Sequence, residues 1–355
     1  MCQCFRELFD AYRVQKFPKA LLRFRELFDI IKAQKFPKGE SAMNNIELIQ
    51  SLINERAEAE ARLSLIPYDG SPEIKENSSG KYLYIRKRVG SRLTSTYVDV
   101  YSDVLYQLLL KNAKESRELK KTIRRLSKEL AELGYRSNKL AANIVINLDF
   151  ARANMKASIY DQAILEGVST TFPQTEDIIE NGTVNGMTAS DIQKILNLKH
   201  AWEFILDEDV LQAESDYYLL CHIAKLINEG FYSNGGKIRG VPVTIGGCNY
   251  IPPIPVENIV KENIRNIIIG NEEDIYKAVN ILLYSMKTQV FIDGNKRAAV
   301  IFTNHYMISH GLGLLVIPEK EVPNFKTLLV KYYEDDDKEE ISKFMITKCW
   351  KKMDA

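Results

Sequence analysis

The residues with the clearest chemistry lie at 291–297, where the sequence reads FIDGNKR. Asp293 is an oxygen ligand of the kind that Mg²⁺ takes when it bridges phosphates. Gly294 lets the chain turn and lets backbone amides approach an anion closely. Lys296 and Arg297 add positive charge, and an arginine can clamp two phosphate oxygens at once. The run predicts a phosphate-binding loop with a metal-competent carboxylate, although alone it would also fit a surface turn before a basic helix.

Two helices must hold this loop. Apolar residues at helical spacing predict one helix over 273–288 and a second over 295–310, which Gly311 ends. The loop then lies at a helix N-terminus, where free N–H groups and a partial positive charge attract phosphate. From about residue 140 onward the chain is predicted to be mostly helical, except for a segment rich in Gly, Val and Pro that predicts a short β-hairpin.

Three separated segments resemble the Fic (Fido) family. One is the motif FIDGNKRAA, and another is GGKIRGVPVTIGG followed by YIPPIP, which resembles the family's flap. The third is ILEGVSTT at 164–171, which resembles the end of the family's inhibitory helix. The resemblance covers about residues 140–350 and keeps the family's order of segments. It implies a mainly α fold, a Fic-type helical bundle with a β-hairpin flap.

The resemblance also implies a role for each motif residue. Asp293 would bind Mg²⁺ together with the phosphates of the substrate, ATP. The nucleotide site would comprise Gly294, Asn295, Lys296 and Arg297, with Asn304 as a weaker candidate near the adenine. The flap residues Thr244, Ile245, Gly246 and Gly247 would pair with an extended segment of a target protein by strand addition. AMP would then pass from ATP to a hydroxyl side chain of that target.

Gln289 departs from the family pattern, because it stands where the family has a histidine. A neutral amide cannot take a proton from a hydroxyl near pH 7, and general-base assistance is worth roughly 10²–10⁴-fold in rate. Gln289 is therefore the catalytic position whose base is missing, beside Asp293 and Arg297. The expected function is Fic-type AMP transfer that is strongly weakened. The alternative is an inactive nucleotide-binding or protein-binding module; a histidine from another chain, or one deliberately replaced, would also fit.

Glu166 and Gly167 are the expected inhibitory residues at the end of a helix over about 145–167. Val300 replaces the arginine that usually pairs with the family's inhibitory glutamate, so Glu166 must pair with Arg297 or stay unpaired. Gln162 stands where inhibitory helices usually carry Ser or Thr. The simpler interpretation of Glu166 is a glutamate near a helix C-terminus that a glycine caps.

The N-terminal region has a different character. Its pattern predicts a helix over 44–62, a β-hairpin over 81–100 with Tyr and Arg along one strand face, and a long helix over 102–133 with a coiled-coil-like seam. Lys111 to Glu132 includes eight Lys or Arg and four Glu. Nucleic acid is a candidate partner of so basic and tyrosine-rich a segment, but a solvated helix face is the favoured interpretation. We expect this region to orient the Fic-like domain or to form a homo-oligomer.

Bulk properties set the remaining expectations. A chain of 355 residues, 45% hydrophobic and with net charge +1, fits two domains and favours no charged partner. Five scattered cysteines fit a reducing cytosol, and the absence of a long apolar run excludes a membrane span, so a cytoplasmic location is expected. We expect a repeated leader over 1–42, disordered or of cloning origin, the hairpin and helix region over 43–138, and the Fic domain over 139–355. Within that domain the flap is expected at about 236–250 and the motif loop at 289–297.

Overall fold

The structure is a computed structural model that describes residues 40–89, 92–137, 139–182 and 186–353. Contacts along the chain divide it into two units, Met1–Leu48 and Ile49–Ala355. In the first unit only the beginning of helix α3 (Glu40–Ser64) is described. The predicted leader therefore lies almost wholly outside the described residues, and its nature stays a prediction.

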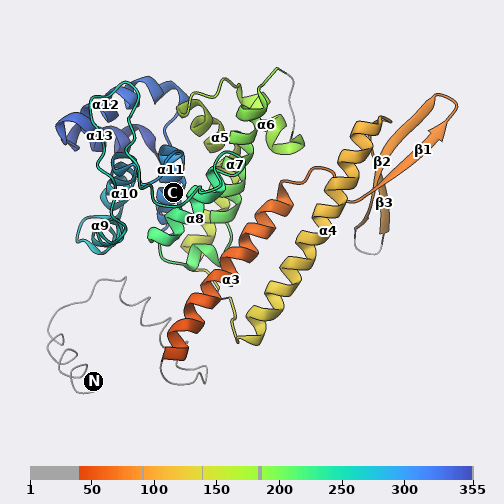
Figure 1. The fold of residues 1–355 in the computed structure, drawn as a ribbon, viewed down its shortest axis with the longest axis horizontal. Coiled ribbons are helices and arrows are strands. Elements are labelled where there is room, and N and C mark those ends of the chain that lie inside the picture. Colours follow the sequence, from red (N-terminus) through yellow and green to blue (C-terminus); the bar gives the residue numbers. More distant parts are fainter. Residues whose placement is uncertain (1–39, 90–91, 138, 183–185, 354–355) are drawn as a thin grey trace. The chain divides into compact units, whose positions relative to one another are not determined.

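A three-stranded sheet and a long helix follow α3 (Figure 1). Helix α4 (Asp103–Glu132) begins at Ser102, whose side chain accepts a hydrogen bond from the N–H of Leu105. The sheet is antiparallel in the order β1 (Ser71–Asn77), β2 (Gly80–Val89) and β3 (Arg92–Val100). The predicted hairpin and long helix are thus confirmed, but β1 was missed because Pro72 and the residues around it signal a turn. A proline is tolerated in β1 because this strand lies at the edge of the sheet.

The sheet packs one face on α4. Leu83 and Ile85 of β2 are buried and form a small core with Leu109 of α4. Successive side chains of a strand point to opposite faces, so the residues of β2 that alternate with Leu83 and Ile85 lie on the face away from α4.

The rest of the chain is a helical assembly, which confirms the mainly α fold. A two-stranded ladder joins β4 (Leu314–Leu315) to β5 (Trp350–Lys351). The helices are α5 (Ala142–Leu165), α6 (Phe172–Asn181), α7 (Ala189–Ile205), α8 (Tyr217–Ile227), α9 (Glu257–Ile269), α10 (Asp274–Thr288), α11 (Asn295–Ser309), α12 (Val322–Asp335) and α13 (Glu339–Phe344), with short 3₁₀ turns at Val210–Gln212 and Glu319–Glu321 and a π-helical turn at Met345–Cys349.

Helix α11 is the centre of this assembly. Nearly every one of its residues is buried, and it packs against α5, α7, α8 and α10. Its N-terminus is therefore held on several sides, which gives the preceding loop a rigid base. Among the described residues, no helix combines the length and the apolar character that crossing a membrane would require.

Candidate nucleotide site

The motif loop joins α10 to α11 and makes two left-handed turns. Gln289 ends α10 with φ 48° and ψ 60°, and Gly294 precedes α11 with φ 76°. Between them Val290 and Phe291 are buried and anchor the loop in the core. A Cβ atom at Gly294 would lie 2.9 Å from Ile227 Cγ2, so both the backbone conformation and the close approach of α8 require glycine here.

Asn295 braces the loop from within. Its Oδ1 accepts a hydrogen bond from the Phe291 N–H at 2.9 Å, and its Nδ2 donates to the Phe291 carbonyl at 2.8 Å. The same Nδ2 donates to Gln289 Oε1 at 3.1 Å, while Gln289 Nε2 donates to the Met286 carbonyl at 2.6 Å. Both polar atoms of the Gln289 side chain are thus engaged by the loop. The side chain of Asn295 is likewise occupied, so this residue can offer an anion its backbone N–H rather than its amide.

The charged groups of the loop meet the end of α5. Glu166 caps α5 and lies with its Oε2 3.4 Å from Arg297 Nε and its Oε1 3.6 Å from Lys296 Nζ. Arg297 also donates from Nη2 to Asp293 Oδ2 at 2.9 Å. The structure therefore brings together Glu166, Asp293, Lys296 and Arg297, residues from two segments that are far apart in the sequence.

This ion-pair cluster leaves buried polar atoms without partners. Arg297 has 4% of its side chain exposed, and its Nε and Nη1 donate no hydrogen bond within the described residues; Glu166 Oε1 accepts none. Buried polar atoms in native proteins are nearly always paired, so unpaired ones need an explanation. An anion that accepts from both arginine nitrogens would supply it, and a phosphate group has the required oxygens.

Gln162 fixes the distance between α5 and α11. Its Nε2 donates to the Arg297 carbonyl at 2.8 Å, and its Oε1 accepts from Trp202 Nε1 at 3.2 Å. The sequence marked Gln162 only as a departure from the family pattern. Its buried amide is a structural link that holds Glu166, one helical turn later, beside the motif.

The segment that is predicted to be the flap contains no β-hairpin. Residues 236–250 contain no strand and form an irregular segment with turns, in which Thr244, Gly246 and Gly247 are exposed and Ile245 packs on the core. Alternating apolar residues predicted strands, but the closely spaced glycines and Pro242 give little support to a ladder.

Arg239 supplies this segment with hydrogen bonds in place of those of a strand ladder. This residue was not singled out from the sequence. Its side chain is 2% exposed and donates to the carbonyls of Gln289 at 2.6 Å, Val241 at 2.7 Å and Pro253 at 2.6 Å. Burial lowers the pKa of its guanidinium from the ordinary value. Arg239 therefore ties both ends of the flap to the first residue of the motif loop. The signal that could have identified it in the sequence is an arginine within a glycine-rich segment.

Asn304 is not at the site, and the expectation that it contacts the adenine is wrong. Its side chain is fully buried in α11. The Nδ2 atom donates to the carbonyls of Val300 at 2.8 Å and Leu315 at 2.9 Å, and Oδ1 accepts from the Leu315 N–H at 2.9 Å. Asn304 therefore holds β4 against α11 and has no free atom for a ligand.

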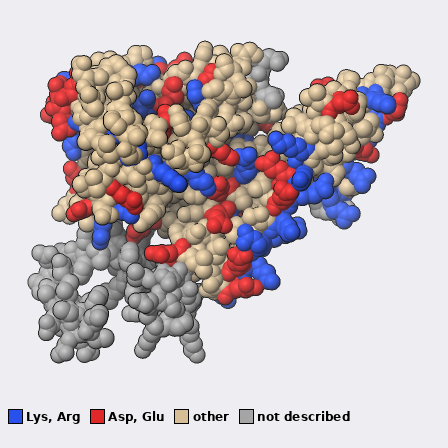
Figure 2. Space-filling model, viewed as in Figure 1, with Lys and Arg blue, Asp and Glu red and all other residues tan. Residues whose placement is uncertain are grey.

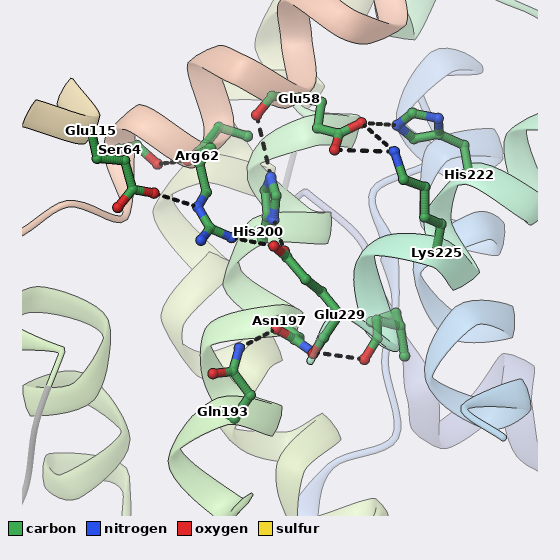
Figure 3. A network of polar contacts seen from close by, with 12 residues as sticks. Glu58, Arg62, Ser64, Glu115, Gln193, Asn197, His200, His222, Lys225 and Glu229 are labelled. Atoms are coloured by element: carbon green, nitrogen blue, oxygen red, sulfur yellow. Dashed lines mark hydrogen bonds and ion pairs between the residues drawn. The ribbon is translucent and has the colours of Figure 1, made fainter. Parts of the chain in front are cut away.

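A polar network links α3 to the helices behind the loop (Figure 3). His200 Nδ1 lies 3.2 Å from Glu229 Oε2, and Arg62 pairs with the other oxygen of this carboxylate. Asn228, the neighbour of Glu229, donates from Nδ2 to the Asp293 carbonyl at 3.0 Å. The network itself thus stops at Glu229, one residue along the chain from the contact with the motif loop.

Glu58 of α3 is another acid in this network. Burial favours its protonated form, but the hydrogen bonds and charges of His222 and Lys225 outweigh this effect and lower the pKa of Glu58 to about 2. Lys225 Nζ lies 3.0 Å from Glu58 Oε2 (Figure 3). These long-range pairs leave no periodic signal, so sequence reasoning missed them.

The geometry agrees with the family comparison. Residues 214–307, from just before α8 into α11, match the model of the Fic/DOC family. The chain is a Fic-domain protein. Membership supports nucleotidyl transfer at the level of the family. Residues 46–107, which cover most of α3, the sheet and the start of α4, match a second model described as a domain of unknown function, DUF6788. No match is found among curated proteins.

Similar solved structures also carry Fic domains. Fic-1 from C. elegans is 16% identical over 67% of this chain and 76% of its own, with a TM-score of 0.46. A Fic family protein from Desulfovibrio desulfuricans is 16% identical over 60% and 73%, with a TM-score of 0.47. A Fic domain containing signaling protein from Bacteroides thetaiotaomicron is 18% identical over 54% and 75%, with a TM-score of 0.42.

Proposed function

We propose that the motif loop binds ATP with Mg²⁺ and that the domain transfers AMP to a hydroxyl side chain of a target protein, at a rate reduced by Gln289. One observation carries the nucleotide site. The buried guanidinium of Arg297 stands at a helix N-terminus with two nitrogens, Nε and Nη1, that have no hydrogen-bond acceptor among the described residues. Such a cation at such a position is suited to a phosphate.

The residues of the loop fit the phosphates of a nucleotide. The first-turn amides of α11, from Asn295 to Arg297, have no acceptor within the helix and are available to phosphate oxygens. Lys296 adds a flexible positive charge at the rim, where a third of its side chain is exposed. Asp293, half exposed, has Oδ1 available for Mg²⁺, which would neutralise charge on the phosphates and the leaving pyrophosphate.

Glu166 is proposed to inhibit this site. Its carboxylate lies against the two cations that would hold the terminal phosphate, so carboxylate and phosphate compete for the same groups. The Glu166 carboxylate leaves its own Oε1 and two nitrogens of Arg297 without a hydrogen bond among the described residues. A phosphate group could accept hydrogen bonds from both of these nitrogens. ATP therefore has to displace Glu166, and anything that moves the end of α5 would favour binding.

The exposed part of the flap is proposed to receive the target. Thr244, Gly246 and Gly247 are exposed and without strand partners among the described residues, so their backbone groups could pair with an extended segment. Arg239 fixes both ends of this segment to Gln289 and to Pro253. A bound hydroxyl would thus be presented beside the first residue of the motif.

Proton transfer is the weak step. The target hydroxyl must lose a proton as its oxygen attacks the α-phosphorus and pyrophosphate leaves. Gln289 offers no basic atom for that proton, and both ends of its amide are already hydrogen-bonded. This engagement favours a second candidate, a module that binds nucleotide or target protein without transfer. The two candidates share the nucleotide site and differ in covalent labelling.

Binding and labelling test the proposal separately. ATP affinity is measured by calorimetry with and without Mg²⁺ for the wild type, Arg297→Ala and the exposed control Arg265→Ala. We expect Mg²⁺-dependent binding that only Arg297→Ala abolishes; equal affinity in all three proteins would refute the nucleotide site. ATP labelled at the α-phosphate is then incubated with the wild type, alone and with a cell lysate. Slow labelling of protein supports transfer, and binding without label supports the second candidate.

A further inference from the structure

Positive charge is concentrated in the sheet and α4. Residues 71–132 contain 14 Lys and Arg against eight Asp and Glu, whereas the other residues contain 34 against 39. Figure 2 shows Lys and Arg side chains gathered along the part of the surface that α4 forms. The chain is nearly neutral as a whole but has a basic region at 71–132. A basic region attracts anionic partners.

The outer face of the sheet, opposite α4, carries part of this charge together with aromatic rings. Because Leu83 and Ile85 face α4, alternation places Tyr82, Tyr84, Arg86 and Arg88 on the outer face, about 6.8 Å apart along β2. Both arginines are exposed, and neither forms an ion pair within the described part of the chain. The outer face thus presents an evenly spaced row of two rings and two free cations.

Tyr97 of β3 completes an aromatic cluster on this face. It is opposite Tyr84 in the ladder, their ring centroids are 5.6 Å apart, and its side chain is 50% exposed. Lys75 Nζ lies 4.2 Å from the centre of the Tyr84 ring and adds a third cation. The acid Glu73 lies 3.9 Å from Lys75, so it offsets the charge of this lysine but leaves the charge of the two arginines.

We propose that this outer face, formed by Lys75, Tyr82, Tyr84, Arg86, Arg88 and Tyr97, binds single-stranded nucleic acid. Bases stack on exposed aromatic rings without regard to sequence, and Arg and Lys neutralise the phosphates between them. An acidic protein would use the cations but has no need of three clustered rings. A bilayer would use the charge but would select apolar side chains rather than tyrosines. The surface shares no residue with the motif loop, so this function is independent of nucleotide transfer.

Fluorescence anisotropy with a labelled single strand of about 12 nucleotides, in DNA and RNA forms, tests the proposal on the full chain. Tyr97→Ala is expected to weaken binding about tenfold, and Tyr97→Phe to retain it because the ring remains. Arg86→Ala with Arg88→Ala is expected to weaken binding and to reduce the slope of log affinity against log salt concentration by about 2. The control Tyr276→Ala removes a ring of similar exposure from α10 and is expected to change nothing.

Three results would overturn the inference. One is absence of binding at low salt in a wild type with a normal melting temperature. Another is binding that Tyr97→Ala leaves unchanged, since stacking would then play no part. The third is equal or tighter binding of poly-glutamate or of anionic vesicles, which would assign the surface to an acidic protein or a membrane. Circular dichroism of each variant shows whether a loss of binding reflects loss of the sheet.

Discussion

Glu166 and Arg297 form an ion pair across two helices, with Oε2 of the glutamate 3.4 Å from Nε of the arginine. Position 300, one turn further along α11, carries a buried valine, so it offers the carboxylate no second arginine. The glutamate therefore rests on Arg297 and Lys296, the same cations that are proposed to hold phosphate. In this chain the inhibitor and the substrate would compete directly for one pair of side chains.

Removing that competition should strengthen nucleotide binding. In Glu166→Gly the two cations no longer pair with this carboxylate. We expect ATP to bind about tenfold more tightly, or about 1.4 kcal/mol, which is close to the lower end of the range for one charge-assisted hydrogen bond. Calorimetric titration measures the change. Asp177→Asn removes a carboxylate from the exposed face of α6 and serves as the control. An unchanged affinity in Glu166→Gly would show that Glu166 is only a helix cap.

Restoring a base at position 289 should restore transfer. In Gln289→His we expect labelling from α-phosphate-labelled ATP to rise roughly 10²–10⁴-fold, because an imidazole can take the proton of the target hydroxyl near pH 7. The left-handed backbone at φ 48° is acceptable, since histidine is among the residues enriched in that conformation.

Gln289→Asn is the matched control for this change, because asparagine also tolerates the backbone but supplies no base. Labelling of both variants at the same rate would mean that the imidazole is not acting as a base. If both bind ATP and neither is labelled, the domain is the binding module.

The sequence predicted the motif loop and its two helices well, because the signals there are local. Gly294 and the apolar spacing on either side depend only on near neighbours, and the structure begins α11 at Asn295 as predicted. The pairing of Glu166 was left between two alternatives, since only the packing of α5 on α11 brings the carboxylate to Arg297. Roles that depend on such distances cannot be obtained from spacing along the chain.

The predictions for the β-hairpin of the flap and for Asn304 were wrong for related reasons. Strands need a partner, and the apolar alternation of 241–245 says nothing about whether one exists; Arg239 supplies hydrogen bonds to the flap instead. Asn304 follows the motif on the same helix, which suggested a contact near the adenine. Burial of α11 on all sides, which places Asn304 against β4, is a property of the whole assembly.

Arg239 should be essential for the order of the flap. In Arg239→Lys one ammonium replaces a planar group that donates to four carbonyls, so several buried acceptors lose their partner. We expect the free energy of unfolding to fall by about 2–3 kcal/mol. Amide exchange over 241–253 should accelerate more than exchange in α11. Arg265→Lys, an exposed arginine on α9, should change neither quantity; equal behaviour of the two variants would remove Arg239 from this role.

His305 should make the stability of the protein depend on pH below neutrality. It is fully buried on α11, with Nδ1 2.8 Å from Ser215 Oγ and Nε2 2.9 Å from the Val210 carbonyl. Burial lowers the pKa of His305 to about 4, although the hydrogen bond to Val210 opposes the shift.

Because the pKa in the folded protein is below the unfolded value of about 6.5, the unfolded state binds the proton first as the pH falls. The contribution of His305 is therefore complete above about pH 6.5 and is lost between that pH and about 4. His305→Gln keeps a donor and an acceptor but does not titrate, so its free energy of unfolding should fall less than that of the wild type from pH 7.5 to 4.5. Chemical denaturation at both pH values measures the difference, and other groups cancel because they are common to both proteins. The same pH dependence in the two proteins would mean that His305 is already protonated, or exposed, in the folded state.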